Sequence, residues 1–170
     1  MMRRPGFTLI ELLVVLAVIG ALFGIGYPVT RSVLAKSHEA ACASKLLGLG
    51  VGLQSYLQEH GDMMPTLAVG RSSKQDDADV LDSILAPYLG SADAFKCPAD
   101  REQFKLTGSS YLWNSTQNGL RVSELSFFGI RDRPDKIPLI TDKEAWHPSG
   151  VNILYADLSS SSQTRFGISH

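Results

Sequence analysis

A single carboxylate, Glu11, stands at the edge of a long apolar run. The eighteen residues 12–29 carry no formal charge, and about 20 residues are enough to cross a bilayer core as a helix. A charge inside a membrane helix costs on the order of 2.5–3.5 kcal/mol, so such a residue needs a partner. Phe7 lies four residues before Glu11, on the same helix face. Glu11 therefore predicts a functional charge pair near the start of this helix.

His147 and Asp157 form a second candidate pair. A histidine and an aspartate can orient a base or bind a metal ion. The sequence offers no nucleophile with a matching partner, which favours a structural pairing that holds a loop to a hairpin. Asp100, Asp142 and Asp157 could supply oxygen ligands for calcium, although their spacing is not that of an EF-hand loop.

Cys42 and Cys97 are the two cysteines of the chain. In an oxidising compartment such a pair predicts a disulfide, which would tie the helix to the domain that follows. The alternative is two free thiols, one of them buried in a helix stripe. Neither cysteine has the spacing typical of a zinc site.

Length and charge limit the class of protein. A chain of 170 residues suits one domain plus a membrane segment, and a net charge of −1 does not favour nucleic-acid binding. Arg3 and Arg4 precede the apolar run, and the positive-inside rule then predicts a cytoplasmic N-terminus. The rest of the chain would face the periplasm or the exterior.

The pattern of apolar residues predicts one long helix over about residues 7–60. Its first half is apolar all round, and Pro28 should kink it. Its second half has one apolar face that should pack on a sheet; the face consists of Cys42, Leu46, Leu49, Leu53 and Tyr56. Gly48, Gly50 and Gly52 interrupt this half, and close packing against a strand would account for them.

The remaining sequence predicts an α+β domain in which the helix packs on a small antiparallel sheet. Residues 62–79 are expected to form a loop, of which residues 71–79 are solvated and mobile. A short helix is predicted over residues 80–85 and is closed by residues 87–90. The strand candidates are residues 110–113, 136–141, 151–156 and 163–168. Pro138 places the second candidate at a sheet edge or makes it a strand start.

The N-terminal residues Gly6-Phe7-Thr8-Leu9-Ile10-Glu11-Leu12-Leu13-Val14-Val15 resemble the class III signal of type IV pilins and type II secretion pseudopilins. The resemblance implies that a prepilin peptidase cuts between Gly6 and Phe7 and that the new amine of Phe7 is N-methylated. Glu11 would neutralise this amine in a neighbouring subunit during assembly. A proline at the depth of Pro28 also fits such proteins.

This resemblance implies a pilin-like domain organisation. Residues 1–6 would be the leader peptide, 7–29 the membrane and assembly half of the helix, 30–61 its amphipathic half and 62–170 the periplasmic α+β part. The protein would be a single-pass inner-membrane protein that enters a type IV pilus or a type II secretion pseudopilus. The implied partners are the prepilin peptidase, other pilin or pseudopilin subunits, the inner-membrane assembly platform and the membrane itself.

The C-terminal half resembles pilin-like proteins that carry a histidine, nine residues and then Asp-Gly. Here His147, nine residues and Asp157 match, within surroundings that also fit: Ala41-Cys42, Cys97-Pro98-Ala99-Asp100, Ser110-Tyr111 and Asp142. Leu158 stands where glycine is expected, and leucine resists positive φ, so a hairpin extended through residues 159–162 is predicted. Major pseudopilins bind calcium near the C-terminal end, which adds to the case for the three aspartates.

Other interpretations remain open at this point. Val33-Leu34-Ala35 could end an ordinary secretory signal peptide, or the helix could be an unprocessed anchor. The alternative function is a membrane-tethered periplasmic binding module that does not polymerise. The sequence contains no motif that indicates an enzyme. The sequence does not distinguish secretion, adhesion, motility and DNA uptake.

Overall fold

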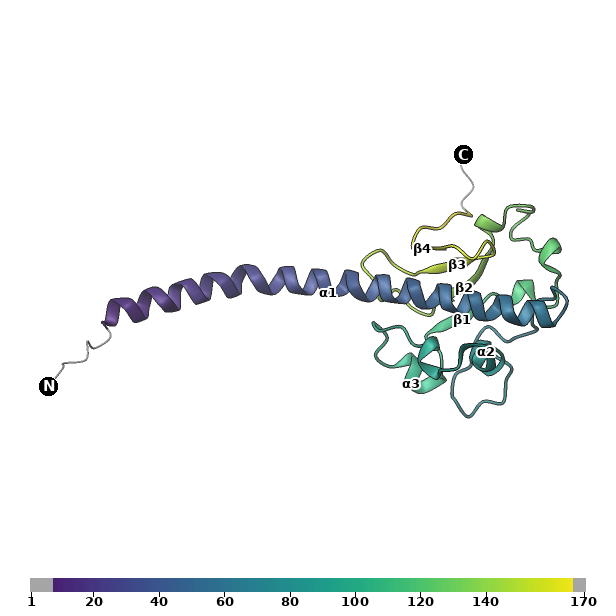
Figure 1. Ribbon diagram of the computed structural model, residues 1–170, viewed down its shortest axis with the longest axis horizontal. Helices are drawn as coiled ribbons and strands as arrows, with labels where there is room; N and C mark the ends of the chain where they lie inside the picture. The colour runs from purple at the N-terminus through teal and green to yellow at the C-terminus, as the bar shows by residue number, and fades with distance from the viewer. Residues whose placement is uncertain (1–7, 167–170) are drawn as a thin grey trace. The chain divides into compact units, whose positions relative to one another are not determined.

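The structure is a computed structural model that describes residues 8–166, apart from the side chains of residues 25, 26 and 28. The chain forms two compact units, Met1–Ala35 and Lys36–His170, and each is described by itself. Gly6 and Phe7 lie outside the described residues, as does the side chain of Pro28, so the cleavage and the kink stay predictions. Figure 1 labels the helices and strands.

The first unit contains the N-terminal part of helix α1, which as a whole runs Leu9–Glu59 and confirms the predicted long helix. By length and composition alone this helix could cross a membrane, since its most apolar window of 18 residues has a mean hydropathy of 2.6. The described side chains of residues 9–34 are all exposed. A helix that is apolar all round needs lipid or other helices around it.

In the second unit, the C-terminal part of α1 buries one face against the rest of the domain. The stripe of buried residues follows helical spacing and consists of Cys42, Leu46, Leu49, Leu53 and Leu57. Leu57 ends this stripe in place of the predicted Tyr56, which is half-buried and stacks on His60 at a centroid distance of 3.8 Å. Each buried leucine contributes about 1.5–3 kcal/mol, so the stripe anchors the helix firmly to the domain.

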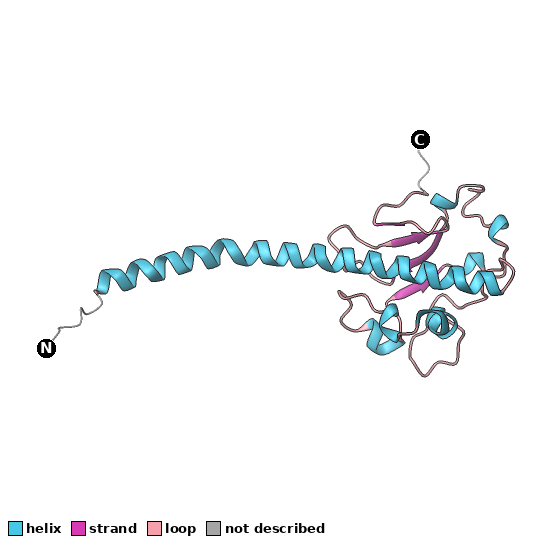
Figure 2. Ribbon diagram, in the orientation of Figure 1, coloured by secondary structure: helices cyan, strands magenta, loops and turns pink. Residues whose placement is uncertain are grey.

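The sheet is a four-stranded antiparallel meander in the order β1-β2-β3-β4. Figure 2 colours the strands magenta and the helices cyan. Its strands are β1 (Tyr111–Trp113), β2 (Pro138–Asp142), β3 (Ile153–Tyr155) and β4 (Ser160–Ser161). Pro138 is the first residue of β2, as one of the two predicted placements requires. The edge placement is wrong because β2 pairs with both β1 and β3; proline is tolerated at the strand start, where its missing N–H is not needed.

The hairpin between β3 and β4 differs from the predicted one. It is tight, because the N–H of Leu158 donates to Tyr155 O and β4 already begins at Ser160. Leu158 adopts φ = 62°, the left-handed conformation that was expected to require glycine. The predicted extension through residues 159–162 is therefore wrong, and so is the strand at residues 163–168, of which residues 167 and 168 lie outside the described part.

The segment between α1 and β1 holds the other helices, α2 (Leu81–Leu89) and α3 (Gln103–Thr107). α2 continues past Pro87, where the sequence predicted its end. The loop that precedes α2 is tethered at Arg71, which pairs with Asp82 and donates to Thr107 O, so the prediction of a wholly solvated loop fails at its first residue. Short 3-10 turns complete the fold: η1 (Ala92–Phe95), η2 (Ser115–Gln117), η3 (Val122–Glu124) and η4 (Pro134–Lys136).

Two of the three glycines in α1 lie where the helix approaches its neighbours closely. A Cβ on Gly50 would lie 3.2 Å from Leu154 and 3.3 Å from Leu158, and one on Gly52 would lie 2.9 Å from Leu89. Gly50 thus permits the close approach to a strand that the sequence suggested, and Gly52 does the same for α2. A Cβ on Gly48 would meet nothing within 4 Å.

Alanine substitutions should distinguish Gly48, which has open space around it, from Gly52, which close packing requires to be glycine. Gly48→Ala should raise the free energy of unfolding by about 1 kcal/mol through helix propensity alone. Gly52→Ala has the same propensity gain but forces Leu89 aside, which typically costs about 1–3 kcal/mol, so its net effect should be lower stability. Chemical denaturation of the two variants, followed by circular dichroism, measures the difference. Equal shifts in one direction would show that Gly52 is not a packing position.

Candidate functional site

Glu11 sits in the first turn of α1 and takes part in a capping box with Thr8. Its Oε2 accepts from the backbone N of Thr8 at 2.8 Å and from Thr8 Oγ1 at 2.7 Å, while the N–H of Glu11 donates to Thr8 Oγ1 at 3.3 Å. The pattern threonine, two residues, glutamate signals such a cap in the sequence, and Thr8 is a functional residue missing from the predicted candidates. Glu11 therefore has a structural role within the chain besides any pairing with a neighbour.

The disulfide between Cys42 and Cys97 connects α1 to the segment after η1. The two Cα atoms lie 5.0 Å apart, and 55 residues separate the cysteines along the chain. A cross-link of that span removes loop-closure entropy worth up to about 4 kcal/mol from the unfolded state in the chain-entropy model. Both cysteines are completely buried, so this bond is part of the core.

His147 lies beside the disulfide and contacts Asp142, not Asp157. Its Nε2 is 3.4 Å from Cys97 Sγ and 3.5 Å from Asp142 Oδ2. Burial lowers the pKa of His147, which favours the neutral imidazole. Burial also raises the pKa of Asp142 to about 6, against the two hydrogen bonds donated by Asn152. The predicted pairing of a histidine with an aspartate exists, but the fold supplies a different aspartate.

Asp157 stays within its own hairpin. Its Oδ1 accepts from the backbone N and the hydroxyl of Ser159, and its Oδ2 lies 4.0 Å from the Arg165 guanidinium. The residue is exposed, whereas His147 is buried. The prediction that His147 holds its loop to the hairpin through Asp157 is therefore wrong. His147 contacts Cys97 and Asp142, whereas Asp157 contacts Ser159 and Arg165.

Asp100 caps the short helix α3. Its carboxylate accepts from the backbone N–H groups of Glu102, Gln103 and Phe104 and from the hydroxyl of Ser110. Four donors occupy its lone pairs, so little of this carboxylate is left for a calcium ion. Within the part of the chain that the structure describes, the three predicted aspartates do not bring their carboxylates together as a metal-binding group. Cys42, Cys97 and His147 do lie close together, but the two sulfur atoms are bonded to each other.

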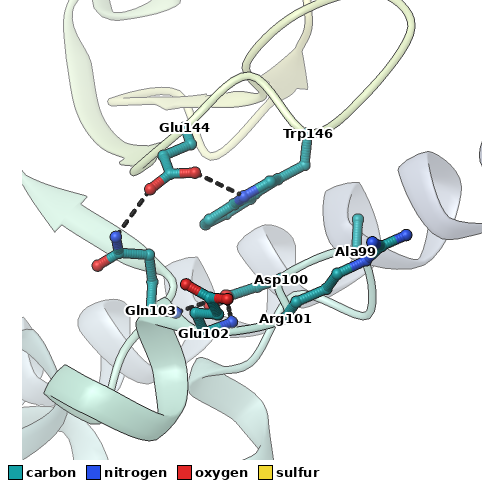
Figure 3. A pocket seen from close by; sticks show the side chains of 7 residues that line it. All are labelled: Ala99, Asp100, Arg101, Glu102, Gln103, Glu144 and Trp146. Carbon is teal, nitrogen blue, oxygen red and sulfur yellow. Dashed lines mark hydrogen bonds between the residues drawn. The ribbon is translucent and has the colours of Figure 1, made fainter.

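An open pocket lies between α3 and the segment that carries Trp146 (Figure 3). Glu144 accepts from Gln103 Nε2 at 2.7 Å and from Trp146 Nε1 at 3.1 Å, so it links the two walls. Of the lining residues, Asp100 is a predicted ligand, and Ala99 belongs to the predicted motif Cys97-Pro98-Ala99-Asp100. The carboxylate of Glu144 is already engaged by these two donors, and the contacts order the segment that leads into His147.

Replacing Asp142 by asparagine should make the disulfide-bonded chain less sensitive to pH. Because its folded pKa of about 6 exceeds the ordinary 3.8, the folded state holds this proton more tightly than the unfolded state does. Raising the pH through this range therefore removes stability, on the order of 3 kcal/mol in all. We expect Asp142→Asn to gain more stability over the natural chain near pH 7.5 than near pH 4, measured by urea unfolding.

The matched control is Asp157→Asn, which changes an exposed carboxylate of the same domain. It should show no comparable gain at the higher pH. If Asp142→Asn instead shifted stability equally at both pH values, ionisation of the buried carboxylate would not be the cause.

Comparisons with known proteins agree with the N-terminal pattern. The family described as the prokaryotic N-terminal methylation motif matches residues 1–27. Over 96 residues the chain is 35% identical to the type IV major fimbrial protein FimA of Dichelobacter nodosus; the match covers 56% of this chain and 59% of the length of that relative. No solved structure matches the chain. The chain therefore carries the type IV prepilin signal, and its long N-terminal helix with a small antiparallel sheet gives it a pilin-like α+β architecture.

Proposed function

We propose that this chain is a structural subunit of a type IV pilus or a type II secretion pseudopilus, not an enzyme. The observation that carries the proposal is the N-terminal part of α1. It is long and apolar enough for a membrane, its described side chains are exposed, and one carboxylate lies in its first turn. Such a helix is stable in lipid before assembly and among copies of itself afterwards.

Charge pairing would then drive the assembly step. A prepilin peptidase cuts after Gly6, and the methylated amine of Phe7 becomes the cation that Glu11 of a neighbouring subunit neutralises. Before the cut no such cation exists, so cleavage licenses assembly. The arginines of the leader keep the N-terminus cytoplasmic, and the domain from residue 62 faces the periplasm.

The capping box adds a constraint to this mechanism. Both hydrogen bonds that Thr8 donates to Glu11 end on Oε2. The carboxylate is thus held close to the start of the helix, where the amine of a neighbour would arrive. Intrachain capping and interchain pairing use the same side chain, and substitutions can separate the two.

Glu11→Gln should abolish filament assembly, because glutamine can still close a capping box but carries no charge. Thr8→Ala is the matched control: it removes the two hydroxyl bonds of the cap while Glu11 keeps its charge and its bond from the backbone N–H of residue 8, so subunits should still enter filaments. The measurement is the amount of subunit that mechanical shear releases from cells without detergent. Normal release of the Glu11→Gln variant would rule out the pairing mechanism.

The N-terminus of the protein from native membranes tests the proposal as a whole. Intact mass and N-terminal sequencing should find a chain that starts at methylated Phe7. A start at Met1, with the protein retained in membranes after shear, would point to the tethered binding module instead. A start near Lys36 would identify a cleaved secretory signal and overturn the proposal.

A further inference from the structure

One aromatic side chain, that of Phe128, stands in water at the tip of a tight turn. It is 86% exposed, a larger fraction than that of any other large apolar side chain in the described part of the chain. Phe127 and Ile130 exchange two backbone hydrogen bonds of 3.1 and 2.9 Å, so residues 128 and 129 form the turn. Aromatic rings stabilise a fold mainly when they are buried, and this ring is not.

The backbone of the turn is strained at the same residue. Phe128 has φ = 47° and Gly129 has φ = 81°. Asparagine, aspartate or glycine is the usual first residue of such a turn, and a bulky side chain with positive φ is an outlier. Phe127 anchors the turn, because its ring meets the edge of Phe166 at a centroid distance of 5.1 Å. A strained aromatic residue that the fold itself does not cover points to a contact outside the chain.

An apolar pocket of the same unit has the right size for such a ring. It lies between α2, η1 and the C-terminal end of α3 and has a volume of about 410 Å³. Its apolar lining consists of Ala86, Pro87, Ala92 and Phe95. Asp82 and Ser91 supply polar atoms to the lining. A cavity of about 150 Å³ with apolar walls is enough to hold benzene, so the pocket has room for a phenylalanine ring.

The charges beside the ring and beside the pocket have opposite signs. Arg131 follows Phe128 by three residues, and Asp93 follows the pocket residue Ala92 directly. Both charged side chains are exposed, and neither forms an ion pair with another described residue. A cation next to the ring and an anion next to the pocket favour this pairing over a random one.

The positions of the ring and the pocket exclude a contact within one chain. Figure 1 shows the green segment around residues 125–135 and helix α2 on opposite sides of α1. A protrusion on one side of a molecule and its pocket on the other side make a heterologous contact. Such a contact repeats from copy to copy and builds an open filament unless the rotation closes a ring.

We propose that Phe128 of one subunit inserts into the pocket between α2 and η1 of a second copy of this chain, with Arg131 facing Asp93. The inference rests on the proposed function, since it names one contact between assembled subunits. An aromatic side chain seated in an apolar pocket with charged groups at the rim is the usual form of an interface hot spot.

Photo-cross-linking tests which surface meets residue 128. p-Benzoylphenylalanine, a photoreactive analogue of similar shape, replaces Phe128 in the full chain, and filaments sheared from cells are illuminated. We expect a covalent dimer in which residue 128 of one chain is joined to a peptide that contains residues 86–95 of the other. The control places the analogue at Leu106, which is 57% exposed on α3, and should not give this dimer.

The outcomes separate this inference from the proposed function. Filaments in which residue 128 is joined to another peptide, to lipid only or to no partner would overturn the inference and leave the filament function standing. Failure of mechanical shear to release the natural chain would overturn the proposed function, and this inference with it.

Phe128→Asn separates docking from folding. Asparagine tolerates positive φ but cannot fill an apolar pocket, so the thermal unfolding midpoint should stay the same or rise. The amount of sheared subunit should fall by about tenfold or more, since truncation of a hot-spot side chain weakens one contact by about 30-fold. A lower unfolding midpoint would show that Phe128 serves the fold, and an unchanged amount of sheared subunit would show that no contact depends on it. Either result would overturn the inference.

Discussion

The main physical constraint on this structure is that the apolar side chains along helix α1 must be kept away from water. In the second unit the domain itself meets this need, because a leucine stripe is buried against the sheet and α2. In the first unit the described side chains of residues 9–34 stay exposed, so the remaining apolar surface must be covered by lipid or by other chains. One continuous helix therefore has an apolar face that its own domain covers and an apolar surface that other molecules must cover. The second surface is the basis of the proposed assembly.

The disulfide and the polar cluster beside it lie at the point where α1 meets the domain. Cys42 opens the buried stripe of the helix, and Cys97 links it to the segment between η1 and α3. His147 and Asp142 reach the same place from the far end of β2. Three parts of the chain are thereby joined through one small buried volume, so a change in the chemistry of the sulfur atoms would be felt in the helix, the sheet and the loop after it.

Sequence reasoning succeeded where the signal is local or periodic. Helical spacing from Cys42 to Leu53 identified the buried face, and short runs rich in aromatic and β-forming residues located three strands of the sheet. It failed where tertiary contacts decide the outcome. Leu158 takes a positive φ in the tight turn that its N–H closes on Tyr155 O, with its side chain beside Gly50 of the helix. His147 contacts Asp142 because β2 and the following segment bring them together. The capping box at Thr8 was a local signal and could have been found.

The contact between Gly50 and Leu158 has an evolutionary consequence. The helix lacks a side chain at the point where the hairpin offers a large one, and the leucine holds a backbone conformation that glycine would adopt without strain. The two positions share one volume, so they are not free to vary independently. In descendants of this chain, a larger residue at position 50 would be tolerated most easily together with smaller side chains at positions 154 and 158, and glycine at position 158 would also relieve the strained turn.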